Sequence, residues 1–410
     1  MSLQFITGGS GAGKSEYLSR LVCEESVRRP HDNFIVVVPE QYTMETQKKL
    51  VHMHSRKGIL NIDVVSFERL AYKVFEELGG GNRPVLDDTG KNLIVRRVLE
   101  KEKKKLDYFG SSIEKTGFVS ELKSVISELL QYGITPQQLG EIGENVKEKQ
   151  QLSAKLKDIR LVYEEFMAFL STNYITSEEI LDVLCGLVEK SKLIAGSEII
   201  FDGFTGFTPI QYKLMRLLLV YSKGIKISVT IDKKERPTGH EGWNNLFFMS
   251  KEMMNRLIAI CEEEGIHVDD TVCVDRDINY RYEGAKDLAY LERNLFRYKG
   301  GVYTGTPENI RIYEGSNPKE ELQYIVSEIL QLTRKEGFRY RDIAVVTADL
   351  ETYGKVAANM MKQNDIPAFL DYKRSVASNP YVEMLCSALE IVEKGYPYDT
   401  MFRYLRTGLT

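Results

Sequence analysis

The chain has 410 residues, more than one hydrophobic core usually serves, so two or three domains are expected. Its 43% hydrophobic and 28% charged residues are typical of a globular protein, and a net charge of -4 excludes a globally basic nucleic-acid binder, though not a local basic groove. The five cysteines form no close pair, which argues against disulfides or zinc. Their scatter favours a reducing cytoplasm. No signal peptide or membrane-length apolar run is evident, so we expect no membrane contact.

A phosphate-binding loop follows the first expected strand. Residues 8–15 read GGSGAGKS, the glycine, lysine and hydroxyl spacing of a P-loop. Residues 3–7 predict a buried strand and those from Glu16 a helix, which is the setting that the motif requires. Lys14 would reach the β- and γ-phosphates and the Ser15 hydroxyl would ligate Mg²⁺; the alternative is a glycine-rich turn without a ligand. The predicted nucleotide contacts are Gly8, Gly9, Ser10, Gly11, Ala12, Gly13, Lys14 and Ser15.

Two further strands, at residues 34–38 and 62–65, are predicted to lie in the same parallel sheet, because they are short and apolar. Ligands of open α/β sheets sit at the carboxyl ends of the strands, which here continue into residues 39–43 and 66–72. These two segments contain aromatic, cationic and hydroxyl side chains, which suit single-stranded nucleic acid. The alternative is that Phe67 and Tyr72 pack the helix that follows.

A glycine-rich break at residues 79–84 precedes helical patterns that run to about Lys190. Apolar residues recur there at helical spacing, and the lysines at 101 and 103–105 are most simply a solvated face. We therefore predict a helical insertion, residues 85–192, within the α/β domain.

The sheet resumes at residues 198–202, a strand that ends in Asp202. A P-loop enzyme places its second Mg²⁺-holding aspartate at such a strand end. Gly203 stands where a motor ATPase carries a glutamate, and no carboxylate occurs from there to Gln211. Loss of a general base should slow hydrolysis by about two to four powers of ten. A further strand is expected at residues 225–230, with helices running on to Arg297.

Residues 299–307 read as an interdomain linker, after which the α/β alternation restarts. Strands are expected at residues 310–313, 343–347 and 368–370. The alternation stops before a second domain is complete, so we expect a fragment of a longer protein.

These segments together resemble a superfamily 1A helicase motor, and Gln211, nine positions after Asp202, fits the second motif of that superfamily. More narrowly, residues 38–43 (VPEQYT), 66–71 (SFERLA) and 201–209 (FDGFTGFTP) resemble the B subunit of the bacterial AddAB helicase–nuclease. The last block is the most specific of the three, and the resemblance covers the whole chain.

The resemblance implies a RecA-like domain 1A (residues 1–84 and 193–298), the helical insertion 1B, and the start of a RecA-like domain 2A (residues 308–410). It implies a heterodimer with an AddA-type motor subunit that resects double-strand breaks, in which the B subunit scans single-stranded DNA for a hotspot sequence. ATP and Mg²⁺ would be its ligands, whereas an iron–sulfur cluster is expected only in a C-terminal region absent here. The DNA contacts would be Gln41, Thr43, Phe67, Arg69, Tyr72 and Phe207; Gln211 would join the nucleotide site, and Ser15 with Asp202 would hold the metal.

The departures from an active motor are the missing glutamate at Gly203, the absence of an adenine-clamping glutamine before Gly8, and Ala348-Asp349 where a motor offers an arginine. They favour a protein that binds nucleotide and has lost hydrolysis. An active DNA translocase and a small-molecule P-loop kinase remain alternatives; the long insertion and second domain argue against the kinase.

Overall fold

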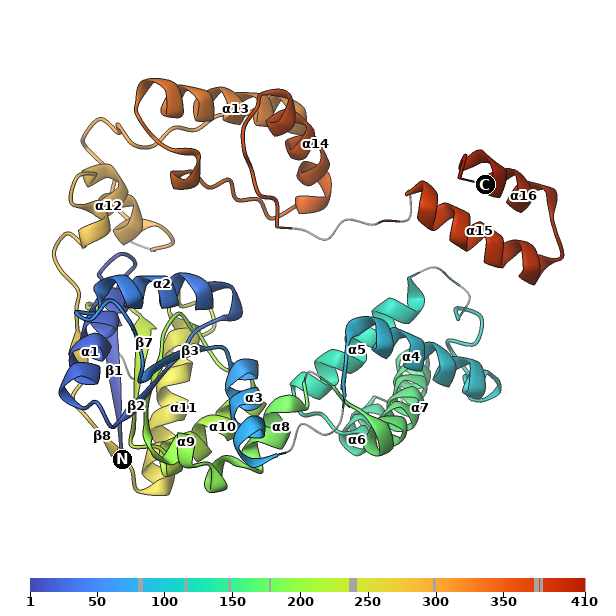
Figure 1. Ribbon diagram of the computed structural model, residues 1–410, viewed down its shortest axis with the longest axis horizontal. Coiled ribbons are helices and arrows are strands. Elements are labelled where there is room, and N and C mark those ends of the chain that lie inside the picture. The colour runs from blue at the N-terminus through green and yellow to red at the C-terminus, as the bar shows by residue number, and fades with distance from the viewer. Residues whose placement is uncertain are drawn as a thin grey trace. The chain divides into compact units, whose positions relative to one another are not determined.

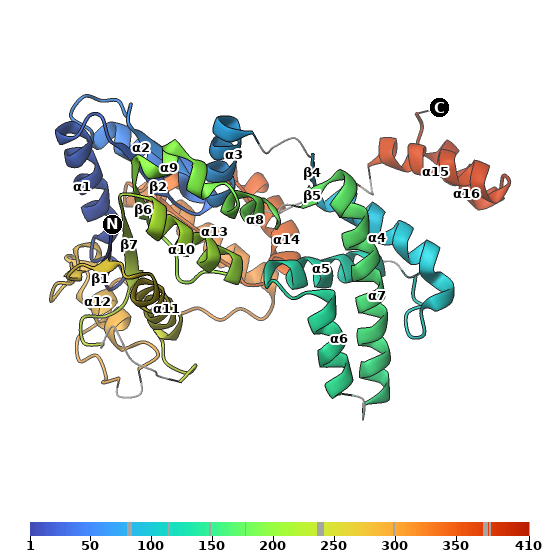
Figure 2. The same ribbon diagram turned by 90° about the horizontal axis from the view of Figure 1, so that it is seen from below.

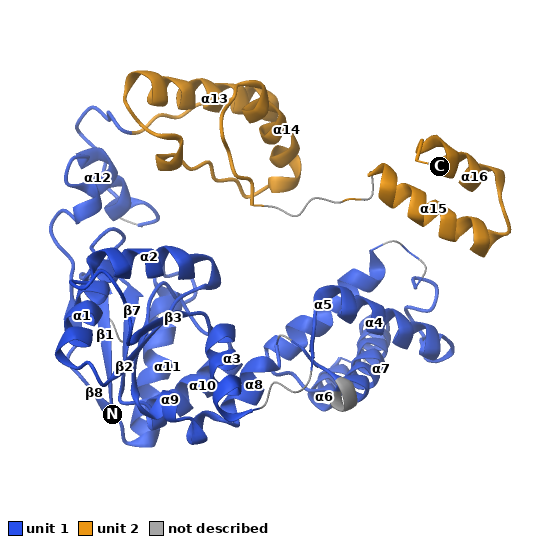
Figure 3. Ribbon diagram, viewed as in Figure 1, with its two compact units in different colours: residues 1–309 blue, residues 310–410 orange. Residues whose placement is uncertain are grey.

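The computed structural model describes residues 1–79, 84–113, 115, 117–146, 149–176, 178–235, 242–297, 300–371, 376 and 379–409. Most of the predicted glycine-rich break at residues 79–84 therefore lies outside the described residues. The chain divides into two compact units, residues 1–309 and 310–410 (Figures 1 and 3).

The first unit is built on a parallel sheet in the order β3-β2-β6-β7-β1-β8, with β9 also paired to β1. Strands β1, β2, β6 and β7 consist mainly of apolar residues. Their register places Ile35 opposite Ile199 and Phe5 opposite Ile227. Such runs suit strands that are covered on both faces. The predicted α/β fold with a P-loop parallel sheet is thus confirmed. The strands are β1 (Ser2–Gly8), β2 (Asn33–Val37), β3 (Ile62–Val65), β6 (Ser197–Phe201), β7 (Gly224–Thr230), β8 (His267–Val268) and β9 (Val272–Cys273).

Helices cover the two faces of this sheet and form two hydrophobic cores. On one face, Leu18, Val22 and Leu50 pack against the strands. They come from α1 (Lys14–Arg28) and α2 (Thr43–Met53). The larger core on the other face is lined by α3 (Phe67–Leu78), α8 (Ile180–Cys185), α9 (Lys192–Ala195), α10 (Pro209–Tyr221) and α11 (Phe248–Glu264).

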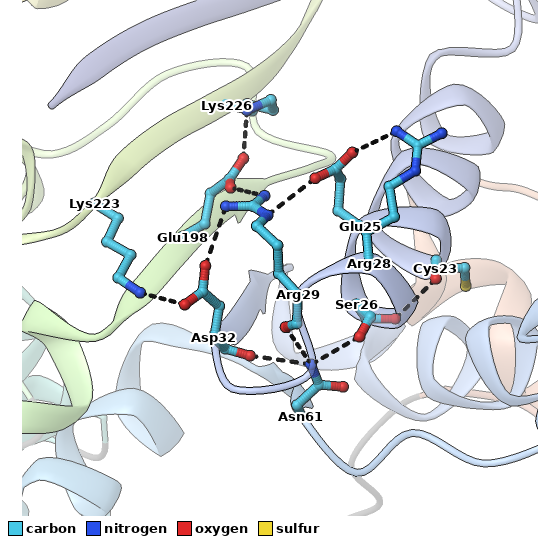
Figure 4. A network of polar contacts seen from close by, with 10 residues as sticks. All are labelled: Cys23, Glu25, Ser26, Arg28, Arg29, Asp32, Asn61, Glu198, Lys223 and Lys226. Atoms are coloured by element: carbon cyan, nitrogen blue, oxygen red, sulfur yellow. Dashed lines mark hydrogen bonds and ion pairs between the residues drawn. The ribbon is translucent and has the colours of Figure 1, made fainter.

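A network of ion pairs lies at the amino ends of the strands (Figure 4). The buried carboxylate of Glu198, at the start of β6, pairs with Arg29 at 2.6 Å and with Lys226 on β7. Asp32 pairs with Arg29 at 3.3 Å and with Lys223 at 2.5 Å. This network joins the end of α1 to β6 and β7 at the amino ends of the strands. The P-loop lies at the other end, after the carboxyl end of β1.

The helical region between β3 and β6 has a hydrophobic core of its own, to which Leu99, Val162 and Phe166 contribute. Its helices α6 and α7 run side by side (Figure 2). Asp158, only 1% exposed, accepts hydrogen bonds from the backbone N–H groups of residues 107–109. The elements are β4 (Val85–Leu86), which pairs with β5 (Ile175–Thr176), and α4 (Asp88–Glu102), α5 (Phe118–Gln131), α6 (Pro136–Asn145) and α7 (Gln150–Asn173).

The sequence pattern predicts helices from β7 to Arg297, but the structure interrupts them with two strands. After α11 the chain returns to the sheet in β8 and β9, both paired to β1. These two-residue strands are too short to leave an alternation pattern. The 3₁₀ turn η4 (Tyr280–Tyr282) and α12 (Lys286–Asn294) follow.

The second unit differs from the sequence prediction. No strand occurs among the described residues of 310–410, so the three predicted strands are wrong for this chain. Ile312, Val346 and Phe369, one from each, are 90–95% exposed. A strand needs a hydrogen-bonded neighbour, and these segments have none. The regular structure of this unit is helical. Helices α13 (Pro318–Lys335) and α14 (Leu350–Gln363) pack against each other, and so do α15 (Pro380–Lys394) and α16 (Tyr398–Arg406).

Candidate nucleotide and DNA site

The loop after β1 has the geometry of a phosphate cradle. Gly11 and Gly13 have φ angles of 71° and 96°, a conformation that side-chain-bearing residues avoid. α1 begins at Lys14 directly after Gly13, so the free N–H groups of the helix start face the loop. The Nζ of Lys14 donates to the carbonyl oxygens of Gly8 and Gly9, at 2.9 Å each. The predicted P-loop residues are therefore brought together around Lys14.

Asp202, at the end of β6, faces the same site. Burial lowers the pKa of Lys14, while the negative charges of Asp202 and Asp275 act in the opposite direction. Ser228 on β7 donates its hydroxyl hydrogen to Oδ1 of Asp202 at 2.5 Å, which fixes the carboxylate. Ser15 lies exposed in the first turn of α1.

Mg²⁺ commonly takes only one or two protein oxygens beside phosphate and water. Ser15 and Asp202 are oxygen donors of that kind, so the residues present fit a magnesium triphosphate. A cluster of three or more metal-ligating His, Cys, Asp or Glu side chains does not occur within the described part of the chain.

Gly203, where the sequence predicts that a catalytic glutamate is missing, has a left-handed backbone. Its φ is 85°, its N–H donates to the Ser228 hydroxyl at 3.3 Å, and a Cβ there would lie 3.4 Å from Cδ of Pro39. An L-residue is strained in this left-handed conformation. The Cβ distance is an ordinary contact, so the cost of a glutamate there would come from the backbone strain.

Sequence reasoning missed a second group of residues at the P-loop, far along the chain. Asp275 accepts a hydrogen bond from the Gly9 N–H at 2.7 Å, and NH1 of Arg281 lies 3.4 Å from Oγ of Ser10. The only local signal is an acidic residue just after a very short apolar run, which is too weak to predict a site. The sequence has Ala348-Asp349 where a motor domain offers an arginine. Arg281, in contrast, places a cation beside the loop.

Five of the six predicted DNA contacts come from the segments after β2 and β3. Gln41 is exposed in the 3₁₀ turn η1 (Glu40–Tyr42), while Thr43 is buried and donates its hydroxyl hydrogen to the Glu40 carbonyl. Arg69 pairs with Glu40 at 3.0 Å across the two segments, and Tyr72 is 42% exposed. Arg69 and Tyr72 also line an open pocket of about 450 Å³ beside the edge strand β3. This edge therefore presents both a cation and an aromatic ring.

Phe67 and Phe207 belong to an aromatic cluster instead of an exposed platform. Phe67 is only 7% exposed, and its ring centroid lies 5.7 Å from that of Phe201 and 6.1 Å from that of Phe207. Phe207 is half-buried and also contacts Tyr212. Phe67 thus lies in the hydrophobic core of this structure, and a role for either ring in DNA binding stays a prediction.

Gln211 has a local structural role. Its Oε1 accepts a hydrogen bond from the Thr208 N–H at 2.9 Å, and the pair forms a capping box at the start of α10. Its predicted contact with nucleotide remains untested.

The fold and this site define a class: an α/β protein with a P-loop at the carboxyl edge of a parallel sheet, a lysine and an aspartate facing the loop, and a helical insertion. Within that class, the sequence pattern described as "ADDB, N-terminal" matches residues 5–292, and the chain belongs to this family.

Several curated proteins are similar over the full length of the chain, and each is named as the B subunit of an ATP-dependent helicase/deoxyribonuclease. The protein from Lachnoclostridium phytofermentans is 42% identical, and those from Caldanaerobacter subterraneus subsp. tengcongensis and Clostridioides difficile are each 36% identical. The chain spans 35–36% of the length of these relatives. Among the described helices, none combines the length and apolar character needed to cross a membrane.

Proposed function

We propose that this chain is the N-terminal, helicase-like part of the B subunit of an ATP-dependent helicase–nuclease that resects DNA double-strand breaks. The observation that carries the nucleotide part is Lys14, which is bonded to the Gly8 and Gly9 carbonyls of the loop and is near enough to Asp202 for that carboxylate to raise its pKa. The loop N–H groups and Lys14 would bind the phosphates, and Ser15 with Asp202 would hold Mg²⁺. The bound metal would neutralise phosphate charge.

We propose that hydrolysis is slow or lost. A water-activating base must lie within hydrogen-bond reach of the attacking water. The position after Asp202 offers no carboxylate, and its left-handed backbone disfavours one. The nucleotide would then regulate the protein instead of driving movement along DNA.

We propose that single-stranded DNA lies along the segments after β2 and β3, and that the protein scans it for a hotspot sequence. Arg69 would contact a phosphate and the exposed ring of Tyr72 would stack on a base, with Gln41 also available in the segment after β2. The buried Thr43 would contribute by holding that segment. Phe67 and Phe207 would contribute mainly by supporting this edge.

The motor partner would be an AddA-type protein in a cytoplasmic heterodimer. The relatives are named as one subunit of an enzyme, which supports an assembly of more than one kind of chain. The iron–sulfur cluster and the nuclease would belong to the part of the longer relatives that this chain does not span.

The test measures Mg²⁺-dependent binding of a fluorescent ATP analogue, ATP turnover with and without single-stranded DNA, and oligonucleotide binding at two salt concentrations. We expect nucleotide binding that Lys14→Ala weakens at least tenfold, little turnover, and DNA affinity that falls steeply with salt. Unchanged nucleotide affinity in Lys14→Ala would exclude the phosphate site. DNA-stimulated turnover at the rate of a motor would instead favour an active translocase, the second candidate, in which Arg281 would contribute the cation beside the loop.

A further inference from the structure

One backbone donor of the P-loop, the Gly9 N–H, is already engaged by a carboxylate of the same chain. Oδ1 of Asp275 accepts the Gly9 N–H at 2.7 Å, and its Oδ2 accepts the Lys233 N–H at 2.8 Å. The sheet fixes this position, because β9 pairs with β1 and the Val274 N–H donates to the Thr7 carbonyl at 2.9 Å. Asp275 follows β9 just as the P-loop follows β1, so both lie at the carboxyl edge of the sheet.

A second carboxylate approaches the loop from α12. The Oε1 of Glu292 lies 3.3 Å from the position that a Cβ on Gly9 would take. Burial and the neighbouring charges of Asp232 and Asp275 raise the pKa of Glu292, while the nearby Ser10 backbone opposes them. Two separate segments thus bring acidic side chains to the loop at Gly9.

The segment that carries Asp275, residues 275–282 (the cover segment), lies directly on the loop. Asn279 is buried, and its Nδ2 donates to the Ser10 carbonyl at 3.3 Å. A Cβ on Gly11 would lie 2.5 Å from Cβ of Arg281, closer than real Cβ atoms approach. This close contact shows that the glycine serves the packing of the cover segment as well as the turn.

A carboxylate oxygen is an anionic acceptor, like a phosphate oxygen, and it uses the same N–H donors. A triphosphate arriving at the loop would lose the Gly9 donor to Asp275 and would meet two like charges at short range. We propose that Asp275 and Glu292 act as internal anions that occupy the P-loop, so that nucleotide binds only by displacing them together with the cover segment. This rests on the nucleotide binding proposed above and adds what limits its affinity.

The test compares the purified full chain with Asp275→Asn, Glu292→Gln and the double variant, which keep shape and remove charge. Matched controls are Asp270→Asn and Glu144→Gln, because both residues are exposed and lie outside the loop contacts described above. Binding of a fluorescent ATP analogue with Mg²⁺, and of inorganic tripolyphosphate, is measured at low and high salt. Thermal melting without ligand identifies any variant that fails to fold.

We expect each site variant to bind both probes at least fivefold more tightly than the parent chain, with no change in the controls and a smaller gain at high salt, where charge repulsion is screened. Glu292→Gln keeps the test valid if Asp275→Asn disturbs the Lys233 contact. If the parent chain binds nucleotide and the site variants bind equally or less tightly, the internal-anion proposal is wrong and nucleotide binding stands. If even the double variant, folded, binds neither probe, both proposals are wrong.

Discussion

The Ser228 hydroxyl lies 2.5 Å from Oδ1 of Asp202 and donates its hydrogen to that carboxylate. The same hydroxyl oxygen accepts the Gly203 N–H at 3.3 Å. One side chain of β7 therefore orients the expected metal ligand and also holds the turn that follows it. Groups that orient a metal ligand typically contribute about tenfold to a hundredfold to metal affinity.

Ser228→Ala should accordingly weaken Mg²⁺-dependent nucleotide binding by about tenfold, in line with that range. The measurement is a titration of a fluorescent ATP analogue with and without Mg²⁺. Because the hydroxyl acts through the metal ligand, affinity without Mg²⁺ should change little. Equal losses in both titrations would mean that the substitution disturbs the turn at Gly203 instead.

Gly203→Glu should not restore hydrolysis and should destabilise the fold. At φ 85°, a side-chain-bearing residue is expected to cost about 1–2 kcal/mol. Gly203→Ala is the matched control, since it introduces the same backbone strain without the carboxylate. Thermal melting should show similar losses for both, and an ATPase assay should show no gain. A stable Gly203→Glu protein with rapid turnover would contradict the proposed loss of hydrolysis.

Phe67→Ala should lower the stability of the protein, whereas Tyr72→Ala should lower its affinity for single-stranded DNA. Phe67 is buried in the aromatic cluster, so its truncation should lower the free energy of unfolding by about 3–5 kcal/mol. Tyr72 is 42% exposed, and its truncation should cost about 1–3 kcal/mol of single-strand affinity if the ring stacks on a base.

Denaturant unfolding and oligonucleotide titrations of the two variants separate these effects. Tyr132→Ala, which removes a similarly exposed ring from the helical insertion, is the control for non-specific loss. A Phe67→Ala protein of unchanged stability and reduced DNA affinity would restore Phe67 to the binding surface. An unaffected Tyr72→Ala would remove Tyr72 from it.

The ion pairs around Glu198 should make stability depend on pH. Burial alone would raise the pKa of Glu198, but hydrogen bonds from Lys226 and Arg29 outweigh it and hold the pKa below its usual value of 4.5. A carboxylate with a lowered folded-state pKa stabilises the protein above its unfolded pKa, and this stabilisation is lost as pH falls through the folded value.

Glu198→Gln should therefore melt at a lower temperature than the parent near pH 7, and the difference should shrink as the pH falls below about 4.5. Melting curves from neutral pH down to about one unit below that value measure it, with Glu24→Gln, an exposed position on α1, as the control. A melting difference that does not depend on pH would mean that the network stabilises the sheet by packing alone.

The sequence alone determined the elements whose signals are local. The P-loop, the strands that end at Gly8, Val37, Val65 and Phe201, and the position of Asp202 all follow from apolar runs and short motifs. These features depend on neighbouring residues, so a short stretch of chain suffices to predict them. The family resemblance rested on the same local blocks, and the family match confirms it.

The tertiary structure decided what depends on residues far apart in the chain. Asp275 meets Gly9 across 266 positions, Phe67 is buried by rings from a distant turn, and the apolar runs of residues 310–370 remain without strand partners. A short pattern carries no information about which distant backbone or side chain will satisfy its donors and cover its apolar surface. Packing and hydrogen bonding between distant segments settle that, and here they place two acids on a loop that the sequence predicts to be a phosphate cradle.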